Sequence, residues 1–136
     1  MTSGRARSRL RILPRRLPAL VSYTALVLFL SALPGRRVAR WGLTPYQLDL
    51  LHIPLFAGLA VVTIWAIVGP RRQRAWGVFL GITLFAAADE ILQLWVPGRV
   101  ASFADFARDA LGAGIGIAFS EGLRPVALAL RKESGR

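Results

Sequence analysis

The stretch AWGVFLGITLFAAADEILQLWV, residues 75–96, decides the class of fold. It is apolar along most of its length, and acidic and amide residues interrupt it only in its second half. Trp76 and Trp95 lie near its two ends. A helix needs about 20 predominantly apolar residues to cross a bilayer, and indole rings favour the two membrane interfaces. The stretch therefore predicts a membrane-spanning helix that carries polar groups near one end.

Three further apolar blocks predict three more spans, at residues 17–33, 48–68 and from 106 to the mid-120s. Arginine-containing segments separate the blocks, and the mean hydropathy of the chain is +0.49. The last block is interrupted by Glu121 and Arg124, whose i,i+3 spacing would let them pair near the membrane surface. We expect one all-α domain, a four-helix transmembrane bundle over residues 17–130. A basic tail, 1–16, precedes it and a short tail, 131–136, follows it.

The start of the chain has a second interpretation. A basic segment before an apolar block is also typical of a secretory signal peptide. Cleavage requires small residues near the cut. The stretch Ser31-Ala32-Leu33-Pro34 has leucine and proline at positions where small residues are needed. An uncleaved first span is therefore favoured.

Charge gives the bundle a direction. The chain has 18 lysines and arginines against 7 acidic residues, a net charge of +11. The basic residues flank apolar spans and form no single basic face, so membrane topology explains them better than nucleic-acid binding. Twelve lie on the side of the two tails and the connection between spans two and three, against four on the other side. We expect both termini to be cytoplasmic in a multi-pass protein of the cell membrane.

If both termini are cytoplasmic, polar residues of three spans lie in the outer half of the bundle. From the rise of 1.5 Å per residue, His52, Glu90 and Asp109 lie about 6, 9 and 4 Å below the outer ends of their spans. Asp89 and Glu90 are adjacent, about 100° apart around the helix, and cannot face one neighbour equally. Carboxylates inside a span rarely persist without a partner or a water-filled cavity. The pattern predicts a common outward-facing pocket.

The same residues allow a purely structural interpretation, an ion-paired layer that fixes helix packing, with Arg99 or Arg108 neutralising a carboxylate. The absence of cysteine excludes a thiolate metal site. A metal site from His52 with carboxylates is conceivable, but no ligand spacing such as His-Glu-x-x-His supports it, so no metal or cofactor is predicted. Gly112 and Gly116 form a G-x-x-x-G in an apolar helix. Small residues at that spacing let helix backbones approach closely. We expect this contact inside the bundle and not in a dimer; no oligomeric state is predicted.

A combined pattern over residues 48–118 resembles the VanZ-like family of small bacterial membrane proteins. The strongest part is Asp89-Glu90-x-x-Gln93, followed by Pro97-Gly98-Arg99, Ser102, Asp105 and Gly112-x-x-x-Gly116; His52 with Phe56 adds to it. The chain departs from the family pattern at Asp109, where the family has Asn, and at Phe56, where it has Tyr. The resemblance implies a link to resistance against the glycopeptide antibiotic teicoplanin.

Three functional hypotheses follow, and no catalytic motif is recognised for any of them. The leading one is an outward polar pocket that binds an envelope component, such as a lipid, or an amphiphilic glycopeptide drug, without chemistry. The alternative is a membrane-embedded enzyme acting on a lipid-linked envelope precursor. Asp89, Glu90 and His52 would supply its acid–base chemistry, and Arg99 would hold a phosphate. A third is an accessory subunit without a ligand. The candidate pocket residues are His52, Asp89, Glu90, Gln93, Arg99, Ser102, Asp105 and Asp109.

Overall fold

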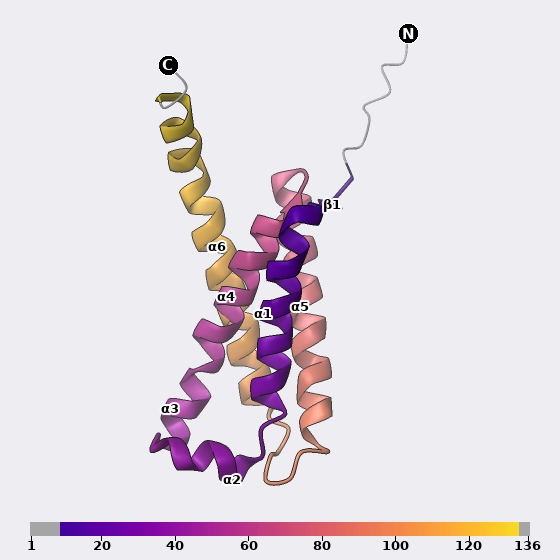
Figure 1. Cartoon of the computed structure of the whole chain (residues 1–136), viewed down its shortest axis with the longest axis vertical. Coiled ribbons are helices and arrows are strands. Elements are labelled where there is room, and N and C mark those ends of the chain that lie inside the picture. Colours follow the sequence, from indigo (N-terminus) through magenta and orange to yellow (C-terminus); the bar gives the residue numbers. More distant parts are fainter. Residues whose placement is uncertain (1–8, 134–136) are drawn as a thin grey trace.

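The computed structural model describes residues 9–133, apart from the side chains at positions 39, 45 and 124–133. Four long helices run alternately up and down the same axis (Figure 1). They are α1 (Leu17–Ser31), α4 (His52–Ala66), α5 (Arg71–Gln93) and α6 (Phe103–Glu133). The predicted all-α class is confirmed, and each predicted span corresponds to one of these helices.

The two ends of the bundle differ. One end holds the described N-terminal residues, the connection between α4 and α5, and the C-terminal part of α6, which projects beyond the other helices (Figure 1). We call it the tail end. The opposite end, the loop end, holds the short helices α2 (Gly35–Val38) and α3 (Pro45–Leu50) and the connection 94–102.

Two helical stretches within the described residues are long and apolar enough to cross a membrane, Tyr46–Ala66 and Arg71–Gln93. The first of these joins α3 to α4. A capping box begins it: the Thr44 hydroxyl accepts the backbone N–H of Gln47 at 3.2 Å, and the Gln47 side chain accepts the N–H of Thr44 at 2.9 Å. These bonds satisfy N–H groups that the first turn of a helix leaves without partners.

Residues 9–16, predicted as part of the basic tail, contact the bundle. Strand β1 (Arg11–Ile12) pairs antiparallel with β2 (Ile67–Val68). A 3-10 turn, η1 (Pro14–Arg16), then leads directly into α1. The Arg16 guanidinium donates to the carbonyl oxygen of Trp65 and lies 4.5 Å from the centre of that indole ring. This cation–π contact and the strand pair hold the segment against the tail end.

The closest helix contact in the bundle joins α4 and α6. A Cβ added at Gly112 would lie 2.4 Å from the carbonyl oxygen of Ile53, and one at Gly116 would lie 2.2 Å from that of Ala57. Only glycine allows such an approach, so the predicted packing role of the G-x-x-x-G inside the bundle is confirmed. The helix itself is longer than the predicted fourth span, because it continues past Pro125 to Glu133.

Candidate functional site

A histidine–aspartate pair lies beside the close α4–α6 contact. His52 begins α4, and its Nδ1 lies 2.9 Å from Oδ1 of Asp109 in α6. Asp109 is fully buried, whereas the His52 side chain keeps 17% of its surface exposed. Gly112, one turn beyond Asp109, touches the backbone of Ile53, next to His52. The glycine contact therefore sets the distance between the paired side chains.

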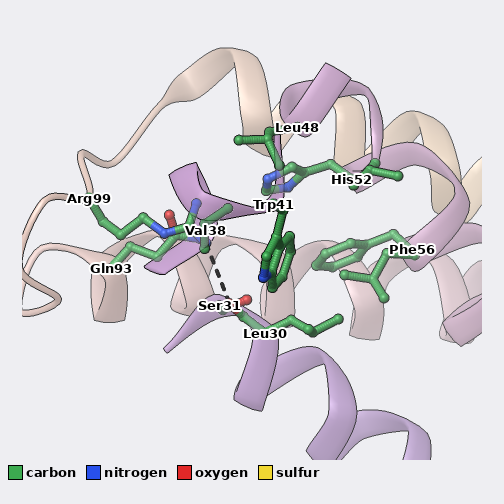
Figure 2. Close-up of a pocket in the computed structure, with 11 residues that line it drawn as sticks. Leu30, Ser31, Val38, Trp41, Leu48, His52, Phe56, Gln93 and Arg99 are labelled. Carbon is green, nitrogen blue, oxygen red and sulfur yellow. Dashed lines mark hydrogen bonds between the residues drawn. The ribbon is translucent and has the colours of Figure 1, made fainter. Parts of the chain in front are cut away.

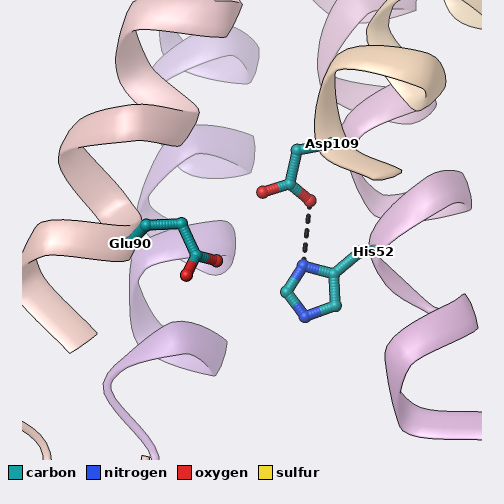
Figure 3. A group of neighbouring side chains, drawn as sticks. All are labelled: His52, Glu90 and Asp109. Atoms are coloured by element: carbon teal, nitrogen blue, oxygen red, sulfur yellow. Dashed lines mark hydrogen bonds and ion pairs between the residues drawn. The ribbon is translucent and has the colours of Figure 1, made fainter. Parts of the chain in front are cut away.

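Glu90 brings a second buried carboxylate to this pair from α5. One of its oxygens, Oε2, accepts the backbone N–H of Ser102 at 2.6 Å. The other, Oε1, and Oδ2 of Asp109 are buried and have no hydrogen-bond partner among the described residues. One ligand-type atom each from His52, Glu90 and Asp109 lies within 4.8 Å of the others (Figure 3). We call these three residues the triad cluster.

Asp89 belongs to a different group. Its Oδ2 accepts the Ser31 hydroxyl of α1 at 2.7 Å and the Gln93 amide at 3.2 Å. Asp89 and Gln93 are 2% and 3% exposed, so these bonds are made inside the protein. The adjacent carboxylates of Asp89 and Glu90 thus face different neighbours, as their separation around the helix predicts.

Arg99 lies in the loop between α5 and α6 and contacts the end of α1. Its Nε donates to the carbonyl oxygen of Leu33 at 3.3 Å and its Nη2 to that of Leu30 at 3.4 Å. Leu30 lies in the last turn of α1, where its carbonyl also accepts the N–H of Leu33 at 3.2 Å, and Leu33 follows the helix. The turn before Arg99 is fixed by Gly98, whose φ of 76° suits glycine, and by a bond from the N–H of Gly35 to the Pro97 carbonyl.

The expected neutralisation of Asp89 or Glu90 by an arginine is not found among the described ion pairs. Arg99 bonds the carbonyls of α1. Arg108 pairs with Asp105 in its own helix and approaches Asp49 at 3.6 Å. No described guanidinium therefore contacts Glu90 or Asp109, and the ion pair of Asp109 is with His52.

A cavity of about 80 Å³ adjoins the triad cluster at His52 (Figure 2). Its polar lining comes from four segments: Ser31 of α1, His52 of α4, Gln93 of α5 and Arg99 of the following loop. Trp41 and Phe56 supply apolar wall. A water molecule occupies about 30 Å³ in the liquid, and drug-sized ligands need several hundred. The cavity therefore has room for a small polar group and not for a whole antibiotic or lipid.

The VanZ/LLP1 family matches residues 11–124, which is most of the chain and includes all four long helices except the last part of α6. The chain belongs to the VanZ/LLP1 family. No curated protein and no solved structure matches it. The predicted resemblance, drawn from residues 48–118, is thereby confirmed. At Asp109, where this chain departs from the expected family pattern, the structure places the fully buried partner of His52.

This VanZ/LLP1 protein brings most of the predicted site residues together at the loop end, but in separate groups. His52, Glu90 and Asp109 meet in the triad cluster. Asp89 accepts hydrogen bonds from Ser31 and from Gln93, and Arg99 lines the cavity. Ser102 and Asp105 have supporting positions at the start of α6. The Ser102 hydroxyl accepts the N–H of Asp105 at 3.3 Å, as helix-capping serines do.

Two features of this VanZ/LLP1 protein were not predicted from its sequence. Ser31, the partner of Asp89, lies at the outer end of the first predicted span, and that depth was the available signal. At the tail end, the buried Arg74 bonds Glu121, which also pairs with Arg71 at 3.1 Å. In the sequence, nothing distinguishes Arg74 from the other arginines of the predicted connection between spans two and three. The side chain of Arg124, the expected partner of Glu121, lies outside the described residues.

Proposed function

We propose that this VanZ/LLP1 protein crosses the cell membrane four times, with both termini in the cytoplasm and the loop end outside. The spacing of exposed aromatic residues supports two crossings directly. Trp76 and Trp95, 63% and 72% exposed, are 19 positions apart, which is about 28 Å along a helix. Tyr46 and Trp65, also exposed, have the same separation. Both spacings fit hydrocarbon about 30 Å thick with rings at its two interfaces.

We further propose that the loop end binds the polar group of an envelope component, and that the protein thereby affects tolerance to glycopeptide antibiotics. The cavity that His52, Gln93 and Arg99 line from three segments carries this proposal. Arg99 uses two of its donors on α1 carbonyls, and a guanidinium has five N–H groups in all. A phosphate or carboxylate head group suits the remaining donors.

The small volume of the cavity limits which part of a ligand can enter it. Only its head group fits inside, so the rest of the molecule lies outside the bundle. The loop end offers exposed apolar surface for it, with Trp41 and Tyr46 on one side and Trp95 and Phe103 near the connection between α5 and α6. An amphiphile held at the membrane interface meets both requirements, because rings of this kind favour that region.

A deletion strain tests the proposal. It is complemented with the wild-type gene, Arg99→Ala, Glu90→Gln or the control Arg40→Ala, which removes an exposed loop-end arginine outside the cavity. Susceptibility to teicoplanin and other envelope-active drugs is measured, with co-purified lipids and protein levels. Arg99→Ala and Glu90→Gln should behave as the deletion and Arg40→Ala as the wild type. If both site variants retain wild-type susceptibility and lipid content at equal protein levels, the proposal fails.

The His52–Asp109 pair favours one alternative, an enzyme acting on a lipid-linked envelope precursor. A buried carboxylate that holds one ring nitrogen orients the imidazole and leaves the other nitrogen for proton transfer. Purified protein incubated with lipid-linked precursors would then show turnover that His52→Gln abolishes and Arg40→Ala retains. No turnover by the wild-type protein would exclude this alternative for the precursors tried.

A further inference from the structure

We propose that His52, Glu90 and Asp109 together bind one divalent transition-metal cation. The three residues come from three helices, α4, α5 and α6, and offer one nitrogen and two carboxylate groups. Their candidate ligand atoms all lie within 4.8 Å of one another. Figure 3 shows the Glu90 and Asp109 carboxylates directed toward the space beside the imidazole ring. Metal binding at this site does not require an envelope ligand to be present.

The hydrogen bonding of the Glu90 and Asp109 carboxylates also favours a bound cation. Each has one oxygen engaged within the protein, Glu90 by the N–H of Ser102 and Asp109 by His52. Each has its other oxygen buried without a hydrogen-bond partner among the described residues. Glu90 is 6% and Asp109 0% exposed. Buried oxygens of this kind cost free energy unless they are paired, and a cation would pair both at once.

Charge around the cluster favours the same conclusion. Two carboxylates share one buried space, and no described arginine contacts either of them. Bringing two like charges together inside a membrane protein is unfavourable, and such groups require a counter-charge or an ion. A divalent cation supplies two positive charges where both carboxylates and the imidazole can reach it.

The donor set points to a particular class of cation. Imidazole suits zinc and other transition metals, carboxylate suits manganese, and magnesium and calcium prefer all-oxygen sites. Ligand atoms of a tetrahedral zinc site lie about 3.3 Å apart, so the side chains must close by up to about 1.5 Å. Rotation of the partly exposed His52 side chain, which lines the cavity, provides that movement and a route for the ion. Zinc(II) and manganese(II) are therefore the expected cations.

Metal binding by the full chain tests the site. The protein is purified in detergent, stripped with chelator, and titrated with Zn²⁺, Mn²⁺ or Mg²⁺, with the metal content measured by mass spectrometry. We expect one Zn²⁺ or Mn²⁺ per chain and far weaker Mg²⁺ binding. Asp109→Asn and His52→Gln should each weaken binding at least tenfold, as loss of a ligand does. The control Asp49→Asn removes a half-exposed carboxylate whose ion-pair partner among the described residues is Arg108, and it should bind as the wild type does.

Several results would overturn the proposal. These are no bound Zn²⁺ or Mn²⁺, equal binding by Asp109→Asn, or preference for Mg²⁺. If Asp109→Asn does not fold, wild-type protein loaded with Mn²⁺ is examined by electron spin-echo spectroscopy, where coupling to a ¹⁴N nucleus is expected from His52. Absence of that coupling also contradicts the site. Because no envelope component is added, failure here is distinct from failure of the proposed function.

Discussion

Replacing Gly116 by alanine should loosen the contact on which the candidate site depends. The new Cβ would lie 2.2 Å from the Ala57 carbonyl oxygen and 2.9 Å from the Cβ of Ala60. Favourable separations between such atoms are about 3.5 Å, so α4 and α6 must move apart by about 1 Å. Both obstructing atoms belong to the backbone or sit directly on it, and no flexible side chain can yield instead.

The expected change in the free energy of unfolding is the balance of two opposing effects. Overpacking of a buried contact costs about 1–3 kcal/mol. Alanine is favoured over glycine in a helix by up to about 1 kcal/mol. We expect Gly116→Ala to lower the free energy of unfolding by about 1–2 kcal/mol. Gly112→Ala, whose Cβ meets the Ile53 carbonyl oxygen at 2.4 Å, should cost more, because separation there also stretches the His52–Asp109 bond.

The chain contains a matched control between these two positions. A Cβ at Gly114 would meet only the edge of Phe79, at 4.0 Å, so Gly114→Ala should be neutral or stabilising. The three variants are unfolded in mild detergent by increasing amounts of sodium dodecyl sulfate and followed by tryptophan fluorescence. An unfolding midpoint for Gly116→Ala equal to that of Gly114→Ala would refute the close α4–α6 packing.

Two further predictions concern buried polar groups at the two ends of the bundle. Glu121→Gln should lower the free energy of unfolding by about 3–5 kcal/mol, because it leaves the buried Arg74 without its carboxylate. Arg71→Gln, at an arginine with 69% of its side chain exposed, should cost well under about 1 kcal/mol; equal losses for the two variants would contradict the buried pair. Ser31→Ala should cost about 1–3 kcal/mol, since it removes a hydrogen bond from the buried Asp89, and the same unfolding assay would reveal an unchanged midpoint if that bond is absent.

The helices were predictable from local features. The runs at 48–68 and 75–96 are long, apolar and bounded by Pro-Gly or Gly-Pro steps, and α4 and α5 follow them closely. The G-x-x-x-G of the last helix also carries its packing role in its spacing. The layer of polar residues was predictable from depth, because the helical rise places them at one level.

The sequence did not allow a prediction of which polar residues of this layer pair with one another. Ser31 and Asp89 are 58 positions apart, and His52 and Asp109 are 57. Which side chains meet depends on how each helix is rotated about its axis, and that rotation is set by tertiary packing such as the Gly112 contact. The strand pair of β1 with β2 was missed for a related reason. An arginine-rich segment carries no strand pattern, and its pairing is specified by the α4–α5 connection.

We propose that the loop end, with its buried polar layer, faces the outside of a four-span protein. The chain has no native cysteine, so single cysteines can report exposure to a membrane-impermeant maleimide in intact bacterial cells stripped of their walls. Val100→Cys, at an exposed position of the loop end, should be labelled in intact cells. Gln73→Cys, exposed at the tail end, should be labelled only after the membrane is permeabilised. Labelling of Gln73→Cys in intact cells, or protection of Val100→Cys, would contradict the proposed orientation of the loop end.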